Sequence, residues 1–152
     1  MRKVLLNLQL ACSKSRKLPD KLTFIHWLET TFPISNKIME VTIRLVNKTE
    51  SRTLNMRYRN KNYPTNVLSF PFISPKGINI PILGDLVICP QVIKDEAQKQ
   101  NKNPKRHWAH VVIHGTLHLL GYNHISNEGF KDMKMMEMKI MRNLGYHNPD
   151  EL

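Results

Sequence analysis

The sequence predicts an α+β fold, with one small mixed β-sheet covered by helices in a single domain over residues 1–152. Three observations support this fold class. Short stretches with apolar residues at every second position predict strands, and they are mixed with longer stretches of helical periodicity. The two types do not alternate strictly, as they would in a fully parallel α/β sheet. One helical stretch, beginning near Pro104, is apolar nearly all round and therefore predicts a buried helix.

The first half of the chain supplies two expected strands and two expected helices. Residues 3–11 and 40–46 alternate apolar and polar side chains, the pattern of half-buried strands. A helix is expected to start at Asp20, a good N-cap residue, and to end at Pro33. A short helix capped by Thr49 is expected after the second strand.

The second half of the chain supplies two more expected strands and two expected helices, followed by a last helix. Residues 67–70 predict a short strand, and Pro71 predicts that this strand ends there or lies at an edge of the sheet. Residues 83–89 predict another strand, and Pro90 opens a helix of about ten residues. The buried helix follows from about Pro104.

The last helix is expected to be capped by Ser126 or Asn127 and to end at Gly145. Its apolar residues recur at helical spacing and predict a face packed on the core. These residues are Phe130, Met133, Met136, Ile140 and Leu144.

Charge and cysteine content narrow the class of protein. The chain has 23 Lys and Arg against 12 Asp and Glu, which gives a net charge of +11. Such a charge could serve solubility alone, but it favours a polyanionic partner such as nucleic acid. Cys12 and Cys89 are too few for a disulfide scaffold and fit a reducing, cytoplasmic location. The alternating start of the chain differs from a secretory signal, and no stretch is apolar for long enough to span a membrane.

Three histidines predict a metal site on the buried helix and the turn after it. His114 and His118 are four residues apart, so both imidazoles lie on one helical face. Gly121 favours a left-handed helix end, which would turn the chain back and bring His124 to the same point. Three ligands with an open fourth position are typical of catalytic zinc, so we expect one Zn²⁺ per chain.

Two other interpretations of these histidines are a different ligand set and a purely structural role. His110 also falls in a step of four, but eight residues of helix rise about 12 Å, too far for His110 and His118 to share one ion. Any one of these histidines alone is more often a packed core residue. His26 has no second ligand nearby and is expected to be structural or exposed, and His147 falls in a loose tail.

Basic and aromatic side chains interleave where the short helix ends. Arg57, Arg59 and Lys61 alternate with two tyrosines, Tyr58 and Tyr63. The basic side chains suit phosphates and the rings suit unstacked bases, so Arg57, Arg59, Lys61 and Tyr63 are the expected RNA contacts.

Asp85 interrupts the apolar run of its strand and has two interpretations. It either caps a neighbouring loop or orients a ligand histidine through a hydrogen bond.

The histidine spacing allows two kinds of hydrolysis. It matches the long zinc-protease motif, but that motif has a glutamate as general base where this chain has Gly115. Cleavage of a phosphodiester depends less on that base, because a metal and an arginine can stabilise charge on the phosphoryl oxygens. Arg59 and His114 are therefore the expected catalytic residues.

The sequence also resembles the YbeY family of bacterial endoribonucleases over nearly its whole length. The resemblance rests on HGTLHLLGYNH at 114–124, on Arg59, on PTNVLSFP at 64–71 and on LGDLVI at 83–88. It implies an α+β domain, a zinc-type ion on His114, His118 and His124, and RNA cleavage or RNA binding by Arg59. It further implies a role in 16S ribosomal RNA 3′-end processing and 70S ribosome quality control, with ribosomal RNA and the small subunit as partners.

The chain departs from the family pattern at two positions. Asn123 stands where the family usually has Asp before the third histidine, which removes a negative charge near the metal but keeps a hydrogen-bonding side chain. Asn60 stands where a glycine is usual, and Asn tolerates a left-handed backbone. Two alternatives to the nuclease remain open, a zinc metallopeptidase and a non-catalytic RNA-binding ribosome assembly factor with a structural zinc.

Overall fold

The computed structural model describes residues 4–13, 17–33, 37–123 and 125–146. Strands and helices follow one another along the chain as the sequence pattern predicts. They are β1 (Val4–Ala11), α1 (Lys21–Thr31), β2 (Met39–Val46), α2 (Lys48–Arg59), β3 (Val67–Pro71), β4 (Ile82–Ile88), α3 (Pro90–Lys99), α4 (Pro104–Leu119) and α5 (Asn127–Asn143).

The four strands form one mixed sheet in the order β1-β2-β4-β3. The first three strands are parallel, with Leu6 opposite Val41 and Ile43 opposite Leu86, whereas β3 pairs antiparallel with β4. Pro71 therefore lies on an edge strand, where a residue without an N–H costs no ladder hydrogen bond. The predicted α+β domain with a small mixed sheet is confirmed.

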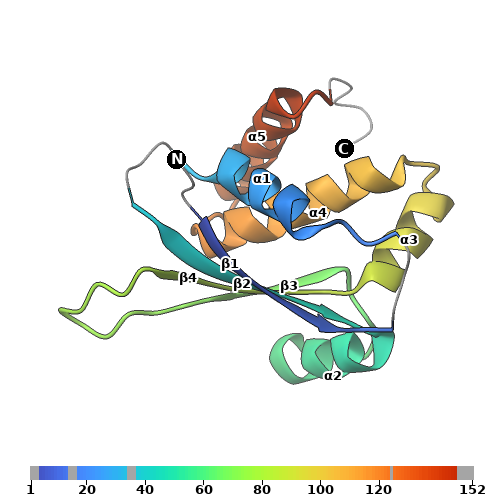
Figure 1. The fold of residues 1–152 in the computed structure, drawn as a ribbon, viewed down its shortest axis with the longest axis horizontal. Helices are drawn as coiled ribbons and strands as arrows, with labels where there is room; N and C mark the ends of the chain where they lie inside the picture. The colour runs from blue at the N-terminus through green and yellow to red at the C-terminus, as the bar shows by residue number, and fades with distance from the viewer. Residues whose placement is uncertain (1–3, 14–16, 34–36, 124, 147–152) are drawn as a thin grey trace.

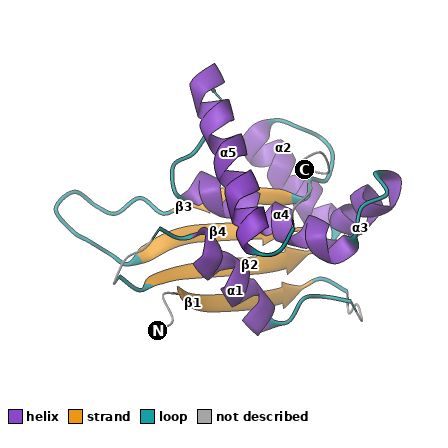
Figure 2. Cartoon of the chain, turned by 90° about the horizontal axis from the view of Figure 1, so that it is seen from above, coloured by secondary structure: helices purple, strands orange, loops and turns teal. Residues whose placement is uncertain are grey.

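Helices cover the two faces of the sheet unequally. α1, α4 and α5 lie over one face, and α2 lies under the other (Figure 1). Seen from above, α4 runs across the sheet with α5 and α1 beside it (Figure 2). Alternate strand residues such as Val41, Ile43 and Leu86 enter the main core beneath α4, while Val46 and Val87 form a small second core with Leu54 of α2.

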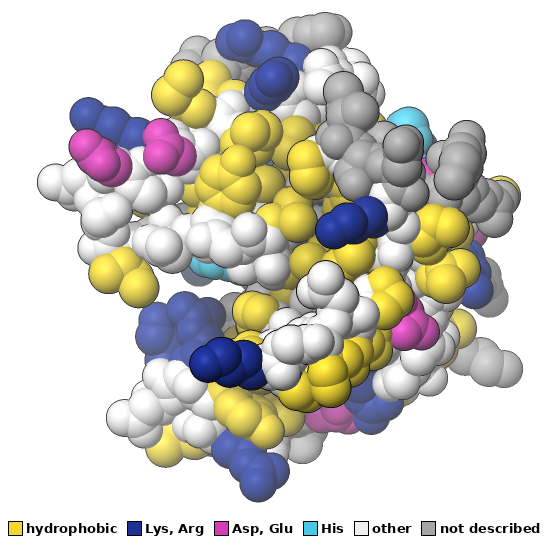
Figure 3. Space-filling view, turned by 90° about the vertical axis from the view of Figure 1, so that its left-hand side faces the viewer, with side chains coloured by type: hydrophobic (Ala, Val, Ile, Leu, Met, Phe, Trp, Pro, Cys, Tyr) yellow, Lys and Arg dark blue, Asp and Glu magenta, His cyan; other side chains and the backbone are white. Residues whose placement is uncertain are grey.

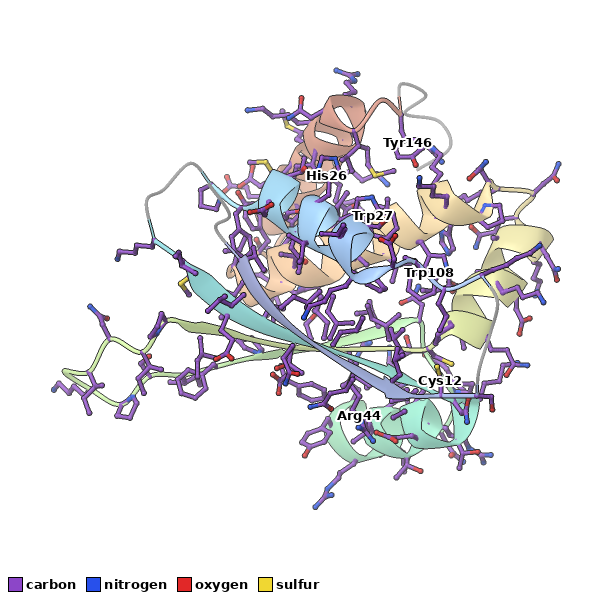
Figure 4. The ribbon with its side chains drawn as sticks, in the orientation of Figure 1. Cys12, His26, Trp27, Arg44, Trp108 and Tyr146 are labelled. Atoms are coloured by element: carbon purple, nitrogen blue, oxygen red, sulfur yellow. The ribbon has the colours of Figure 1, made fainter. Side chains whose placement is uncertain are left out.

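Aromatic side chains join α1 to α4. Asp20 caps α1 as predicted, and its carboxylate accepts a hydrogen bond from the Thr23 amide at 2.8 Å. The ring of Phe24 then forms edge-to-face contacts with Trp27 and Trp108, at centroid distances of 5.9 and 5.8 Å. These two tryptophans are contributed by α1 and α4 (Figure 4), and their burial fixes one helix against the other.

Two sequence predictions about the helices are wrong. α2 starts at Lys48 rather than at Thr49, and its N-cap is Asn47. The Asn47 side chain accepts a hydrogen bond from the Ser13 amide at 2.9 Å, so tertiary contact with the end of β1 decides the helix start. The sequence predicts that Phe130 packs in the core, but its side chain is 53% exposed. It lies one turn before the first buried residue of α5, Met133.

No helix within the described ranges is long and apolar enough to cross a membrane.

Candidate functional site

The second half of α4 presents three histidines along one face. The ring centroids of His110 and His114 are 6.3 Å apart, and those of His114 and His118 are 4.7 Å apart. Steps of four residues stack these side chains on successive turns, as the sequence predicts. All three are partly buried, because the rest of α4 is packed between the sheet and two helices.

A buried glutamate of α5 holds two of these histidines. One carboxylate oxygen of Glu137, Oε1, lies 2.6 Å from His114 Nδ1, and the other, Oε2, lies 2.9 Å from His110 Nε2. Glu137 is 4% exposed. Burial by itself would raise its pKa, but hydrogen bonds from His110 and His114 outweigh that effect and lower the pKa to about 2. The carboxylate is therefore ionised and accepts both bonds.

The orientation of His118 is set by the turn that ends α4. Gly121 has φ of +102°, the left-handed conformation predicted for it, and the Tyr122 amide bonds back to the Leu117 carbonyl. This turn places the Tyr122 carbonyl oxygen 3.1 Å from His118 Nδ1. Because a carbonyl only accepts, Nδ1 of His118 carries the proton.

The two neighbouring Nε2 atoms are arranged as metal ligands would be. Nδ1 donates in both rings, so in the neutral imidazoles Nε2 of His114 and Nε2 of His118 each carry a lone pair. These atoms lie 3.2 Å apart. Two nitrogens bound at about 2.1 Å to a tetrahedral ion are separated by about 3.4 Å, so the donor pair fits a divalent cation.

The third predicted ligand lies outside the residues that the structure describes. His124 is in the gap between residues 123 and 125. Within the described ranges, no group of three or more His, Cys, Asp or Glu side chains is arranged to hold a metal ion. The three-histidine site with one Zn²⁺ therefore stays a prediction, of which the structure describes the first two histidines.

Gly115 directly follows His114, about 100° further round α4, and packs against the sheet. A Cβ atom at this position would lie 2.9 Å from Val67 Cγ2, 3.0 Å from Leu86 Cδ2 and 3.2 Å from Ser69 Oγ. Ser69 Oγ also donates a hydrogen bond to the Gly115 carbonyl at 2.9 Å. The absence of a side chain thus allows the helix backbone to approach β3 and β4 closely.

The predicted RNA contacts gather at the C-terminal end of α2 and beyond it. Arg57, Arg59, Lys61 and Tyr63 are all exposed. Arg57 lies over the ring of Tyr58, with its guanidinium carbon 5.8 Å from the ring centroid. Among the described residues, no hydrogen bond or ion pair joins Arg59 to the histidines.

The edge strand β3 lies between the histidines of α4 (His110, His114 and His118), which we call the histidine cluster, and the basic C-terminal end of α2. Ser69 bonds to Gly115 on one face of the sheet, and the next residue, Phe70, packs on Tyr58 on the other face at a centroid distance of 5.0 Å. His114 directly precedes Gly115 in the sequence, and Arg59 directly follows Tyr58. Figure 3 shows a notch on this side of the molecule, with a histidine surface at its upper wall and Lys and Arg side chains across from it.

The two residues proposed as orienting partners occupy different places. Asp85 is exposed on β4. Its two neighbours, Gly84 and Leu86, lie on the face of the sheet that packs against α4. Strand alternation therefore directs Asp85 to the other face of the sheet. Asn123 shapes the turn before α5, where its Oδ1 accepts a hydrogen bond from the Ile125 amide at 3.0 Å.

Sequence reasoning missed Glu137, although a signal for it exists. Glu137 falls in the apolar stripe of α5, four residues after Met133 and three before Ile140, both of which are buried. A carboxylate in such a stripe needs a buried partner. In this fold the partners are two histidines of α4.

Comparison with known proteins gives matches over most of the chain. Residues 12–145 match the family model described as Endoribonuclease YbeY. The structure is similar to the solution structure of TM1509 from Thermotoga maritima, with 25% sequence identity and a TM-score of 0.54. That similarity covers 96% of this chain and 95% of the other.

Proposed function

Because this chain belongs to the Endoribonuclease YbeY family, we propose that it is a metal-dependent nuclease that cleaves single-stranded RNA. Its proposed work is the maturation of the 3′ end of 16S ribosomal RNA and quality control of 70S ribosomes in the cytoplasm. Its partners would be ribosomal RNA and the small ribosomal subunit. The net charge of +11 supports a polyanionic substrate.

One observation carries the metal dependence. The Nε2 atoms of His114 and His118 face each other at 3.2 Å, and their Nδ1 atoms are held by Glu137 and by the Tyr122 carbonyl. Metal-binding histidines are typically oriented in this way, by a carboxylate or a carbonyl on the second ring nitrogen. His124 would complete the set, and one zinc ion per chain is the proposed cofactor.

The proposed chemistry divides the work between the metal and the protein. A bound divalent ion supplies Lewis acidity and lowers the pKa of coordinated water. His114 and His118 would hold that ion, and Glu137 keeps the His114 ring in the tautomer that has its lone pair on Nε2. Arg59 would stabilise the negative charge that develops on the phosphoryl oxygens.

Gly115 argues against the peptidase alternative. The position that carries the general base in zinc proteases faces the sheet, where even a Cβ atom would meet Val67 and Leu86 within 3.0 Å. A glutamate there would overpack the contact between α4 and the sheet.

The test is cleavage of a single-stranded 16S ribosomal RNA 3′-end fragment by the purified protein. His114→Ala should remove metal-dependent cleavage, and Arg59→Ala should reduce it by about a hundredfold or more, the usual effect of losing one group that stabilises developing charge. His26→Ala and Arg142→Ala provide matched controls, because both residues are exposed and lie outside the proposed site.

Each outcome has a definite meaning. Equal cleavage by the wild type and His114→Ala would identify a contaminating nuclease and contradict the proposal. Ribosome association that survives His114→Ala without any cleavage by the wild type would support the assembly factor instead.

A further inference from the structure

The outer surface of α2 carries a pocket that is separate from the histidine cluster. It has a volume of about 550 Å³, within the range typical of sites for small molecules. It is lined by Lys48, Thr49, Arg52, Thr53, Met56, Asn62 and Pro64. The wall opposite the helix is thus formed by the segment that follows α2.

That segment, residues 60–66, folds back along the helix and is fixed to it by polar side chains; we call it the return loop. Asn60 starts it in a left-handed conformation, with φ of 59°. Buried Asn55 donates a hydrogen bond to the Tyr63 carbonyl at 2.8 Å, and buried Ser51 bonds to the backbone of Thr65. The pocket is therefore formed before any ligand arrives, which lowers the entropic cost of binding.

The electrostatics of this surface favour an anion. Residues 48–61 contain five Lys and Arg and one acidic residue, Glu50. Glu50 is already paired with Arg44 of β2 through two bonds of 2.7 and 3.0 Å, and Figure 4 shows Arg44 on the α2 side of the sheet. The positive charge of α2 is thus left largely uncompensated.

Arg52 is the cation best placed to act in the pocket. Its Nε donates to Asn62 Oδ1 at 2.8 Å, which fixes the guanidinium against the return loop. Among the described residues, no carboxylate pairs with it. Lys48, by contrast, forms an exposed ion pair with Asp95 at 2.8 Å. Met56 and Pro64 add an apolar surface beside the charge, which suits a ribose or a base.

We propose that this pocket binds a nucleotide of the single-stranded RNA substrate outside the cleavage site. Arg52 contacts a phosphate, and Met56 and Pro64 contact the sugar or the base. Arg57 and Arg59 lie farther along the same helix, toward the β3 edge that borders the histidine cluster, so one strand of RNA can follow basic residues from one region to the other. This inference rests on the proposed nuclease function and extends its RNA contacts.

The test is the affinity of the full-length protein for a fluorescein-labelled 16-nucleotide oligouridylate, measured by fluorescence anisotropy at several salt concentrations. The RNA is checked on a gel after each titration to show that it is intact. Arg52→Gln should weaken binding about threefold to fivefold, the size of one exposed ion pair. It should also lower the slope of log K against log salt by about 0.7, the value for one phosphate contact on a single strand.

Two variants separate charge from structure. Lys99→Gln removes one exposed positive charge from α3 and should bind RNA as the wild type does. Asn62→Ala removes the partner of Arg52 Nε without changing the charge, and it should keep the salt slope of the wild type. Thermal melting of each variant establishes that it is folded.

Equal affinity and equal salt slope for Arg52→Gln and Lys99→Gln would overturn the assignment. A wild type that binds no RNA would overturn it as well. A third result would also overturn the assignment: Arg52→Gln weakens the binding of polyglutamate but leaves the affinity for RNA unchanged. The pocket would then be assigned to an acidic protein. Cleavage is a separate result. A wild-type protein that binds RNA but does not cut it would contradict the proposed nuclease function and leave the proposed nucleotide pocket in place.

Discussion

At the scale of single residues, Glu137 has the strongest influence on the histidine cluster. Its two carboxylate oxygens bind His110 and His114, and it is almost completely buried. A charge in such a place is stable only when hydrogen-bonded, and here both bonds come from histidines. The same contacts therefore satisfy Glu137 and fix the imidazole ring that faces His118.

Replacing Glu137 by Gln should weaken zinc binding by about tenfold to a hundredfold, the usual cost of losing a partner that orients a metal ligand. The neutral amide can present its donor group to His114 and no longer selects the Nδ1–H tautomer. Zinc affinity is measured by competition with a chromophoric chelator. Glu128→Gln, an exposed change on the same helix, is the control, and equal affinities for the two variants would disprove the orienting role.

Gly115→Ala tests the close contact of α4 with the sheet. In an open helix this change stabilises a protein by about 1 kcal/mol, because alanine favours helix. Here the new methyl would lie within 3.2 Å of Val67, Leu86 and Ser69. We therefore expect a destabilisation of about 1–3 kcal/mol, the cost of overpacking a core, measured by urea unfolding. A stabilised variant would show that the contact between α4 and the sheet is looser than described.

At the scale of elements, α2 and the return loop form one unit. Two buried polar side chains of the helix, Ser51 and Asn55, bond to the backbone of the loop rather than to other side chains. A loop of irregular backbone needs such partners, because its N–H and C=O groups have no ladder of their own. The exposed basic residues are consequently carried on a defined surface.

Asn55→Ala should therefore release the return loop. Losing the hydrogen bond from the buried Asn55 side chain to the Tyr63 carbonyl is expected to cost about 1–3 kcal/mol in unfolding free energy. Amide hydrogen exchange should also accelerate at residues 60–66. Thr53→Ala, an exposed change on the same helix, should stay within about 0.5 kcal/mol of the wild type. Unchanged exchange in the Asn55 variant would contradict the account.

At the scale of the whole molecule, Glu96 connects three elements. From α3 it accepts hydrogen bonds from His107 of α4 at 2.9 Å and from Asn66, which directly precedes β3, at 3.0 Å. Burial by itself would raise the pKa of Glu96, but the hydrogen bonds from His107 and Asn66 outweigh it and lower the pKa below its usual value. The carboxylate is thus more acidic in the folded protein than in the unfolded chain.

This lowered pKa predicts a loss of stability in acid. The contribution of Glu96 is fully present above the unfolded pKa of about 4.3, and it disappears as the pH falls through the lower folded value. Glu96→Gln should therefore reduce the unfolding free energy at neutral pH and flatten its decline below about pH 4.5. Urea unfolding across pH 3–7 measures this, with Glu128→Gln as the control; parallel pH profiles for wild type and Glu96→Gln would refute it.

The sequence by itself determined the order of the elements and the pairing of two histidines on α4. Period-two alternation marks β1 and β2, the caps Asp20 and Ser126 mark the starts of two helices, and the four-residue step brings His114 and His118 together. These features follow from backbone geometry between near neighbours in the chain, so a local pattern is sufficient to encode them.

Only the tertiary structure decided which distant groups complete the site. Glu137 reaches His114 across 23 residues because α5 packs on α4. Ser69 and Phe70 contact different helices because consecutive strand residues point to opposite faces of the sheet. Such contacts depend on how whole elements pack against one another, and no local period in the sequence specifies that packing.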